Sequence, residues 1–159
     1  MSKSDANIQS SPCPCGSSLF YEECCGRILE SGATALGAEQ LMRSRYTAFY
    51  LGHSQYLFDT SSASLQSQLT VEALQVSCDQ CQFIKLDVLN YGENWVEFIA
   101  HLIADDEYQQ LHEKSQFVRE GGEWKYDTGE LFPTPRKRLK RNDDCPCTSG
   151  KKYKKCHMR

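Results

Sequence analysis

The sequence predicts an α+β fold, with N-terminal helices packed on a curved antiparallel sheet and a small metal-binding knuckle at each end. Three observations lead to this prediction. Apolar residues recur at helical spacing between residues 38 and 76, and with a period of two between residues 83 and 126. Clusters of cysteine lie near both ends of the chain. Helices that precede an antiparallel meander are typical of the α+β class.

A long helix is predicted over residues 38–51. Four large side chains between Met42 and Tyr50 follow one another at i, i+4, i+7 and i+8, so they share one face of that helix. Gly52 comes next and is a common helix stop, because glycine adopts the left-handed conformation at little cost.

Two shorter helices are predicted before the sheet begins. One covers residues 54–58, and residues 61–64 are interpreted as a turn or loop. Thr70 is placed to cap a third helix that runs through residue 76. Glu72 lies in the first turn of that helix, where a negative charge is favourable.

The second half of the central region predicts four strands separated by turns. The strands are expected over residues 83–89, 95–104, 107–120 and from residue 124 to at least 126, with turns at 91–94, 105–106 and 121–122. In the second strand one face carries Val96, Phe98, Ala100 and Leu102. The other face of that strand carries Trp95, Glu97, Ile99, His101 and Ile103.

Several polar residues of the central region are candidates for a pocket. They are Arg43 and Arg45 on the long helix, Trp95, Glu97 and His101 on one strand, and Glu113 and Ser115 on the next. A carboxylate, a histidine and an arginine around one pocket would allow acid–base chemistry. The preferred interpretation is a structural core in which polar groups such as Arg45 and Glu113 pair with one another. No catalytic residue is assigned, because nucleotide-binding glycine loops, nucleophile elbows and H-E-x-x-H motifs are all missing from the sequence.

Two cysteine clusters with identical spacing form an internal repeat. Each has the pattern C-x-C-x8-C followed by one more ligand, and the expected ligands are Cys13, Cys15, Cys24 and Cys25 in the first cluster and Cys145, Cys147, Cys156 and His157 in the second. The eight-residue spacer is long enough for about two helical turns, with Ser17 and Ser149 as the expected caps.

Four cysteine or histidine ligands predict a tetrahedral metal site in each cluster. Zinc is the expected ion at both sites, and iron(II) is the alternative. No stretch approaches the ~20 apolar residues of a membrane span, and the first residues lack the apolar segment of a signal peptide. These observations predict a cytoplasmic protein. Disulfides are therefore disfavoured, because cysteines are kept reduced in the cytoplasm. Cys78 and Cys81 are interpreted as ordinary thiols, with a reversible disulfide as the alternative.

Charge is distributed unevenly along the chain. Residues 133–159 contain ten basic and two acidic residues, a net charge of +8, whereas residues 1–132 carry −11. A basic tail favours an acidic partner, with a merely solvated linker as the alternative. The residues predicted to contact that partner are Lys151, Lys152, Tyr153, Lys154 and Lys155. RNA is a weaker alternative, because only Tyr153 interleaves with the lysines for base stacking.

The second cluster resembles the SEC-C motif, the metal-binding element at the C-terminus of the bacterial SecA translocation motor. The resemblance covers Cys145–Cys147 and Ser149–His157, with Thr148 where the motif usually has glycine. The first cluster is a looser copy, with Cys25 at the position of His157.

With its central signature at Leu41–Phe49, Glu113–Arg119 and Gly122–Tyr126, the chain resembles the YchJ family. The resemblance implies an NTF2-like cone with a pocket and no established reaction. Together with the composition and the cysteine clusters it predicts five segments: a polar, disordered start (1–11), an N-terminal knuckle (12–27), the NTF2-like domain (28–132), a basic linker (133–142) and a C-terminal knuckle (143–159).

Because the SecA tail binds the SecB chaperone and ribosomal surfaces, the expected function is that of a metal-binding adaptor. It would dock to an acidic protein such as SecB, or to the ribosome, in protein export or proteostasis. The alternative is an enzyme or small-molecule-binding protein that uses the central pocket.

Overall fold

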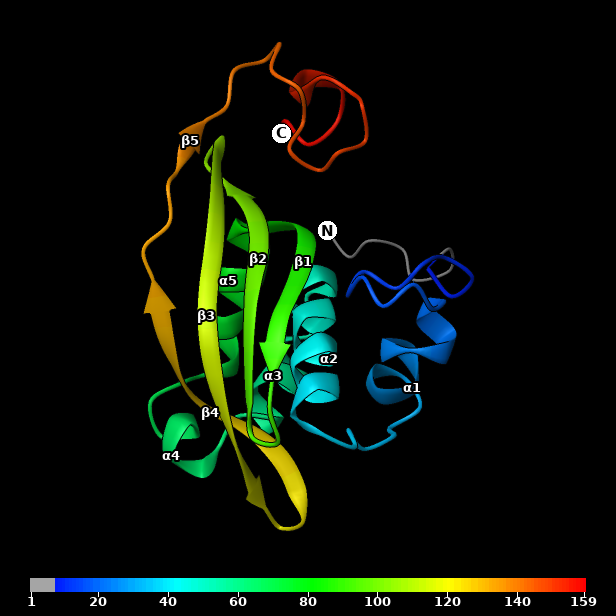
Figure 1. Cartoon of the computed structure of the whole chain (residues 1–159), viewed down its shortest axis with the longest axis vertical. Helices are drawn as coiled ribbons and strands as arrows, with labels where there is room; N and C mark the ends of the chain where they lie inside the picture. Colours follow the sequence, from blue (N-terminus) through cyan, green and yellow to red (C-terminus); the bar gives the residue numbers. More distant parts are fainter. Residues whose placement is uncertain (1–7) are drawn as a thin grey trace.

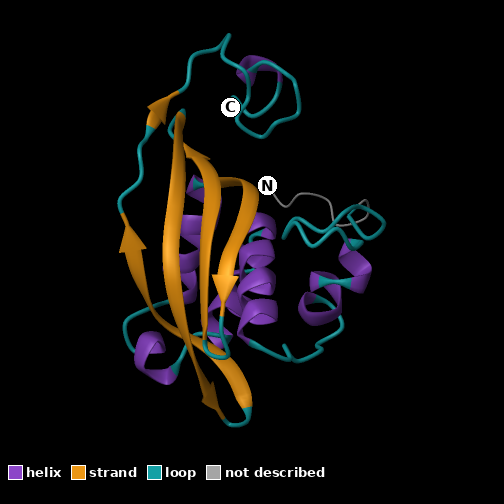
Figure 2. Ribbon diagram, in the orientation of Figure 1, coloured by secondary structure: helices purple, strands orange, loops and turns teal. Residues whose placement is uncertain are grey.

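The computed structural model describes residues 8–159 and has the predicted α+β architecture. Its main elements, in chain order, are η2 (Tyr21–Glu23), α1 (Cys25–Leu29), α2 (Ala38–Leu51), α3 (Ser54–Asp59), α4 (Ala63–Gln66), α5 (Val71–Gln80), β1 (Gln82–Tyr91), β2 (Trp95–Ala104), β3 (Glu107–Glu120), β4 (Glu123–Phe132), β5 (Lys137–Arg138) and η3 (Tyr153–Lys155). The helices cover one face of an open, curved antiparallel sheet (Figures 1 and 2).

The sheet is a meander in the order β1-β2-β3-β4, and β5 adds a short fifth strand against β3. Tight connections set this order. Asp105 and Asp106 form the β2–β3 turn with φ angles of 50° and 58°, and Gly121 and Gly122 form the β3–β4 turn at 60° and 81°. Positive φ at both central residues suits the right-handed twist of a hairpin.

The predicted helices are present, and two of them extend further than expected. Gly52 ends α2 in the left-handed conformation, at a φ of 83°. Thr70 caps α5 by accepting a hydrogen bond from the Ala73 N–H at 3.1 Å, and α5 continues to Gln80 rather than ending at residue 76. The stretch predicted as a turn or loop, residues 61–64, overlaps the start of α4, which the Ser62 hydroxyl caps by accepting from the Leu65 N–H.

The main core lies between α2 and the helix-facing side of the sheet. Val96, Phe98 and Ala100 point into it from β2, as the alternation of apolar residues predicts. A separate, smaller core at the far end of the sheet joins Ile103 to Leu139 and to the C-terminal knuckle. Figure 1 shows that knuckle beyond the tip of β3 and the N-terminal knuckle beside α1 and α2.

Two segments outside the central domain make defined contacts. Of the predicted disordered start, residues 1–7 lie outside the described part of the chain, whereas residues 8–11 form turns in which the Ser11 N–H donates to the Ile8 carbonyl at 2.9 Å. The predicted linker is held on the sheet by β5 and by the buried side chain of Leu139.

None of the helices in residues 8–159 combines the length and the hydropathy that crossing a bilayer requires.

Candidate metal centres

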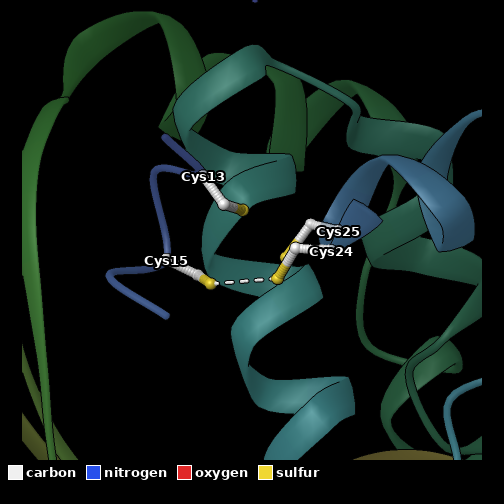
Figure 3. Close-up of side chains that lie close together, drawn as sticks. All are labelled: Cys13, Cys15, Cys24 and Cys25. Atoms are coloured by element: carbon white, nitrogen blue, oxygen red, sulfur yellow. Dashed lines mark hydrogen bonds between the residues drawn. The ribbon is translucent and has the colours of Figure 1, made fainter. Parts of the chain in front are cut away.

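The N-terminal knuckle folds as a closed loop that brings two pairs of cysteines together. A bridge between Pro12 and Phe20 closes the loop, and the Cys13 N–H donates to the Leu19 carbonyl at 2.8 Å. The 3-10 turn η2 then returns the chain, so that the second pair of cysteines meets the first. Figure 3 shows all four thiols converging on one point, from Cys13, Cys15, Cys24 and Cys25.

The C-terminal knuckle repeats this backbone. Asp144 bridges Lys152, the Cys145 N–H donates to the Lys151 carbonyl at 2.9 Å, and η3 returns the chain. The side chains that converge here are Cys145, Cys147, Cys156 and His157. The repeat seen in the sequence is therefore also a repeat in three dimensions.

The predicted helical turns in the spacers are wrong for both knuckles. Each spacer contains a single 3-10 turn of three residues. Ser17 and Ser149 cap no helix; their hydroxyls lie 3.1 Å from Cys24 Sγ and 3.4 Å from Cys156 Sγ, close enough to donate to a thiolate. This second role was not foreseen, although serine two residues after the second cysteine recurs in both copies.

Left-handed residues explain why the spacers cannot be helical. The N-terminal spacer has positive φ at Gly16 (78°) and Ser18 (71°), and the C-terminal spacer at Thr148 (65°) and Gly150 (79°). Each copy thus has one glycine and one other residue at the same two positions, in opposite order. Thr148 keeps the turn although it stands where the SEC-C motif usually has glycine.

The donor atoms fit a tetrahedral ion. Within each cluster, one ligand atom from every residue lies within 4.8 Å of the others. Cys15 Sγ is 3.7 Å from Cys24 Sγ, and Cys147 Sγ is 3.5 Å from Cys156 Sγ. Four thiolates at about 2.3 Å from zinc would be about 3.8 Å apart, so these spacings match. The two clusters are consistent with two metal sites.

Thiol ionisation in both clusters favours a metal ligand. Hydrogen bonding with Cys15 raises the pKa of the Cys13 thiol to about 11, and the same contact holds the pKa of Cys15 well below its usual value. In the C-terminal cluster burial raises the pKa of Cys145 to about 11. Burial also opposes ionisation of Cys147, but hydrogen bonds from Ser149 lower its pKa overall. One thiol of each cluster is thus ready to become the thiolate that a metal binds.

The two clusters differ in how deeply they are embedded. In the N-terminal cluster Cys13, Cys15 and Cys25 are buried and belong to the main core. Arg43 on α2 donates to the Cys15 carbonyl at 2.7 Å, and Thr47 Oγ1 lies 3.9 Å from Cys13 Sγ.

In the C-terminal cluster only Cys145 is buried, and the knuckle rests on the end of the sheet. Tyr153 is its anchor: the ring is buried against Ile103 and the hydroxyl donates to Asp106. Gln82 Nε2 donates to the His157 carbonyl, and Arg159 donates to the Asp79 carbonyl. The knuckle is therefore docked rather than loosely tethered.

The residues predicted to contact a partner divide into two groups. Lys151, Lys152, Lys154 and Lys155 are exposed around the C-terminal knuckle. Tyr153 is only 1% exposed, so its predicted partner contact is corrected: the ring packs against the protein's own sheet.

Comparisons with known proteins agree with this arrangement. Residues 37–129 match the family described as "YchJ, middle NTF2-like domain", and residues 141–159 match the SEC-C motif. UPF0225 proteins of Enterobacter sp. strain 638 and Pectobacterium carotovorum strain PC1 are each 38% identical, over 91% and 92% of this chain and 95% and 97% of their own.

The chain belongs to the YchJ (UPF0225) family.

Two solved structures are similar to this YchJ-family protein. The solution structure of a SEC-C motif-containing protein from Rhodopseudomonas palustris superposes with a TM-score of 0.69 at 32% identity, covering 76% of this chain and 98% of its own. The crystal structure of a SEC-C motif-containing protein from Psychrobacter arcticus gives 0.65 at 23% identity, over 94% and 97%. The second likeness concerns the fold alone.

The NTF2-like domain of this YchJ-family protein has a partly open cavity of about 280 Å³ between α2 and the sheet. Its lining is mostly apolar and includes Phe98, Leu111 and Phe117. Three of the predicted pocket residues, Arg45, Glu113 and Ser115, line it as well.

The other four predicted pocket residues do not line the cavity. Because the helices cover the Val96 face of β2, Trp95, Glu97 and His101 point to the opposite side of the sheet. There Glu97 contacts His112 Nε2 at 2.8 Å, and Asp87 contacts His101 Nε2 at 2.8 Å. Arg43 turns away from the cavity toward the N-terminal knuckle.

Arg45 and Glu113 do not form the direct pair that the sequence suggested. Arg45 donates to the Leu57 carbonyl and to Thr60 Oγ1, and its guanidinium lies 4.8 Å from the centre of the Tyr126 ring. Glu113 Oε1 accepts from the Tyr126 hydroxyl at 2.7 Å and from Ser115 at 2.7 Å. Tyr126 therefore connects the two charges, a role that pairing by charge alone could not reveal.

Cys78 and Cys81 are both free thiols. Cys78 is buried in a small core beneath α5, and Cys81 reaches the cavity. Burial raises the pKa of Cys78 to about 11 and also raises that of Cys81. A raised pKa lowers thiolate content and thus reactivity, in keeping with the interpretation as ordinary thiols.

Proposed function

We propose that the C-terminal knuckle is a metal-folded docking module that binds an acidic surface of a partner protein. The observation that carries this proposal is the ring of exposed lysines, Lys151, Lys152, Lys154 and Lys155, on a knuckle held in a fixed orientation. Tyr153 and Leu139 anchor the unit to the end of the sheet. A fixed cluster of cations pays less ordering entropy on binding than a flexible tail would.

Zinc is the proposed ion in both knuckles, with iron(II) as the alternative. Four thiolates, or three thiolates and an imidazole, are the usual donor set of structural zinc. Cys145, Cys147, Cys156 and His157 would hold it in the C-terminal knuckle, with Nδ1 of His157 as the donor because it lies 3.2 Å from the Sγ atoms of Cys145 and Cys156. Bound metal would fix the loop that carries the lysines.

The proposed partner is an acidic chaperone of the SecB type, and the proposed location of this binding is the cytoplasm. Support comes from the SEC-C match of residues 141–159, since the SecA tail that this motif resembles binds that chaperone. A role in protein export or proteostasis follows from the same likeness. Ribosomes are the competing partner and form a second arm of the test.

The test is direct binding of the zinc-loaded chain to purified SecB and to purified ribosomes, measured by interferometry at two ionic strengths. We expect binding to SecB that weakens as salt rises. The Lys151→Glu, Lys154→Glu, Lys155→Glu variant should bind at least tenfold more weakly, because each reversal places a carboxylate opposite an acidic surface.

The control reverses two charges elsewhere, in the Lys85→Glu, Arg119→Glu variant, where both residues are exposed and lie outside the knuckles. That variant should keep nearly full affinity. If ribosomes bind and SecB does not, the partner assignment is wrong. If the triple reversal binds either one as the wild type does, the docking surface is wrong.

A second candidate function is the binding of a small, mostly apolar molecule in the central cavity. The cavity volume favours it, and so does Tyr46, which lines the cavity and whose buried hydroxyl has no hydrogen-bond partner among the described residues. Screening small apolar alcohols and amines by NMR would test it. Glu113→Gln should weaken any hit, whereas His112→Gln, on the opposite face of β3, should not. The absence of any hit in such a panel would count against this function.

A further inference from the structure

The two knuckles share one backbone but present opposite chemistry at equivalent exposed positions. Where the C-terminal knuckle has Lys151 and Lys152, the N-terminal knuckle has Leu19 and Phe20, which are 51% and 50% exposed. Where the C-terminal knuckle has Lys154 and Lys155, the N-terminal knuckle has Glu22 and Glu23, both exposed. Buried tyrosines, Tyr21 and Tyr153, separate the two pairs in each copy.

Local charge follows the same division. Residues 12–27 contain two acidic residues and one basic residue, a net charge of −1, and residues 143–159 contain five basic and two acidic residues, a net charge of +3. The metal ligands increase this difference in net charge. Four thiolates around a divalent ion carry about −2, whereas three thiolates with an imidazole carry about −1. The N-terminal knuckle is thus an apolar and acidic surface, and the C-terminal knuckle a basic one.

The two knuckle surfaces are complementary in charge and in apolar contact. Two lysines can pair with Glu22 and Glu23, and the methylene stems of two others can cover Leu19 and Phe20 while their ammonium groups stay in water. An ammonium above the Phe20 ring adds a cation–π contact. Neither glutamate has an ion pair within the described part of the chain. Only Lys152, bound to Asp144 at 2.7 Å, is already paired among the four lysines.

We propose that the N-terminal knuckle is the docking site for the C-terminal knuckle of a second copy of this chain. Within one chain the two knuckles rest on different parts of the fold, one on α2 and the other on the tip of the sheet. None of the hydrogen bonds or ion pairs found between residues 8 and 159 joins the exposed residues of one knuckle to those of the other. Two reciprocal contacts of this kind would close a dimer.

The association is expected to be weak and sensitive to salt. Each knuckle is small, so one contact falls below the area of stable interfaces, and exposed charge pairs are screened. The same lysines serve the proposed docking to an acidic partner, so the dimer would compete with that partner. This inference therefore rests on the exposed lysines of the proposed function but not on the partner's identity.

Sedimentation velocity of the zinc-loaded full chain tests the proposal over a wide concentration range at low and high salt. We expect the weight-average sedimentation coefficient to rise with concentration at low salt only. The Glu22→Lys, Glu23→Lys variant and the Lys154→Glu, Lys155→Glu variant should each raise the dissociation constant about tenfold or more, equivalent to about 1.4 kcal/mol.

The decisive experiment mixes the two charge-reversal variants and measures their association by sedimentation velocity. Each interface of the mixed pair then joins lysines to glutamates, so the mixture should associate more tightly than either variant does alone. The Glu72→Lys, Glu93→Lys variant makes the same change in net charge at exposed residues outside the knuckles, and it should behave as the wild type does.

Two results would overturn the proposal: a wild type that stays monomeric throughout, or reversed variants that fail to associate when mixed. These results leave the docking proposal untouched, because Glu22→Lys, Glu23→Lys keeps all four lysines and should still bind SecB. A chain that dimerises but does not bind SecB would overturn only the docking proposal.

Discussion

The N-terminal and C-terminal knuckles have the same backbone in two different surroundings. The first lies against α2, where Arg43 holds the Cys15 carbonyl and three of the four cysteines belong to the main core. The second sits on the tip of the sheet, where Tyr153, Ile103 and Leu139 form a separate core. The same ligand pattern is therefore part of the main core at one end of the chain and forms a separately packed module at the other.

The contrast indicates that ligand spacing specifies the local fold, while the residues between the ligands specify its use. The central spacer residue that anchors each knuckle is the same in both copies, because Tyr21 and Tyr153 are both buried. The two exposed residues on each side of that tyrosine are apolar and acidic in one copy and all lysine in the other. Four paired substitutions can test this division.

The largest expected difference follows loss of one ligand in each knuckle, Cys15→Ser against Cys147→Ser. Both variants should bind one metal ion fewer per chain, because each cluster loses a ligand of its tetrahedral set. Cys15→Ser should lower the free energy of unfolding by about 4 kcal/mol, because it also disrupts the main core. That loss equals a fall in Tm of roughly 8–16 °C.

Cys147→Ser should shift the main thermal transition by only a few degrees, because the tip of the sheet can lose its knuckle while the main core stays packed. Thermal unfolding followed by circular dichroism, with metal content from plasma mass spectrometry, measures both quantities. Equal shifts in Tm would show that the two knuckles are equally integral to the fold.

The next difference separates the two buried tyrosines. Tyr153→Phe removes a hydrogen bond to the Asp106 carboxylate and should loosen the C-terminal knuckle by about 1.5–3 kcal/mol. Tyr21→Phe should be nearly neutral, because the Tyr21 hydroxyl is buried with no partner among the described residues. Hydrogen exchange of the knuckle amides gives the measurement. A larger effect at Tyr21 than at Tyr153 would contradict the assigned contacts.

A smaller difference is expected at the left-handed glycines. Gly16→Ala should cost about 2 kcal/mol, because alanine would have to keep the positive φ and its methyl group would lie 3.4 Å from the Leu86 carbonyl oxygen. Gly150→Ala has the same backbone strain but open space around it, and it should cost about 1 kcal/mol. Chemical denaturation resolves the two values, and the reverse order would mean that packing at Leu86 does not matter.

The smallest effect is expected at the surface. Lys152→Ala breaks an exposed ion pair with Asp144 and should leave the melting temperature unchanged within error, since exposed pairs contribute little. Its equivalent, Phe20→Ala, removes a half-exposed ring and should be equally silent in monomer stability. A marked loss of stability from either change would assign these side chains to the fold rather than to binding.

Much of this fold could be predicted because the local signals agree with one another. The strands Trp95–Ala104 and Glu107–Glu120 end where their turns begin, and the cap at Thr70 and the stop at Gly52 mark their helices. The convergence of each cysteine cluster was also foreseen, since identical spacing leaves few arrangements. These features depend on residues close together in the sequence.

The failures in the candidate pocket and at Tyr153 required knowledge of tertiary packing. Alternation divides β2 into two faces, but it cannot say which face the helices cover, so Glu97 and His101 were placed in the cavity. The connection of Arg45 to Glu113 through Tyr126 spans three elements. Tyr153 looked like a contact residue because it lies among lysines, yet its ring belongs to the core at the tip of the sheet.

The position of α2 has one further consequence. Arg43 and Thr47 on this helix contact the N-terminal knuckle, while Met42, Arg45 and Tyr46 line the cavity. A shift of α2 would therefore change contacts in both the N-terminal knuckle and the cavity. Reciprocity then requires that, if a ligand in the cavity changes the metal affinity of the knuckle, the metal changes the ligand's affinity by the same factor. Through this helix, metal binding at the knuckle and ligand binding in the cavity would be thermodynamically coupled.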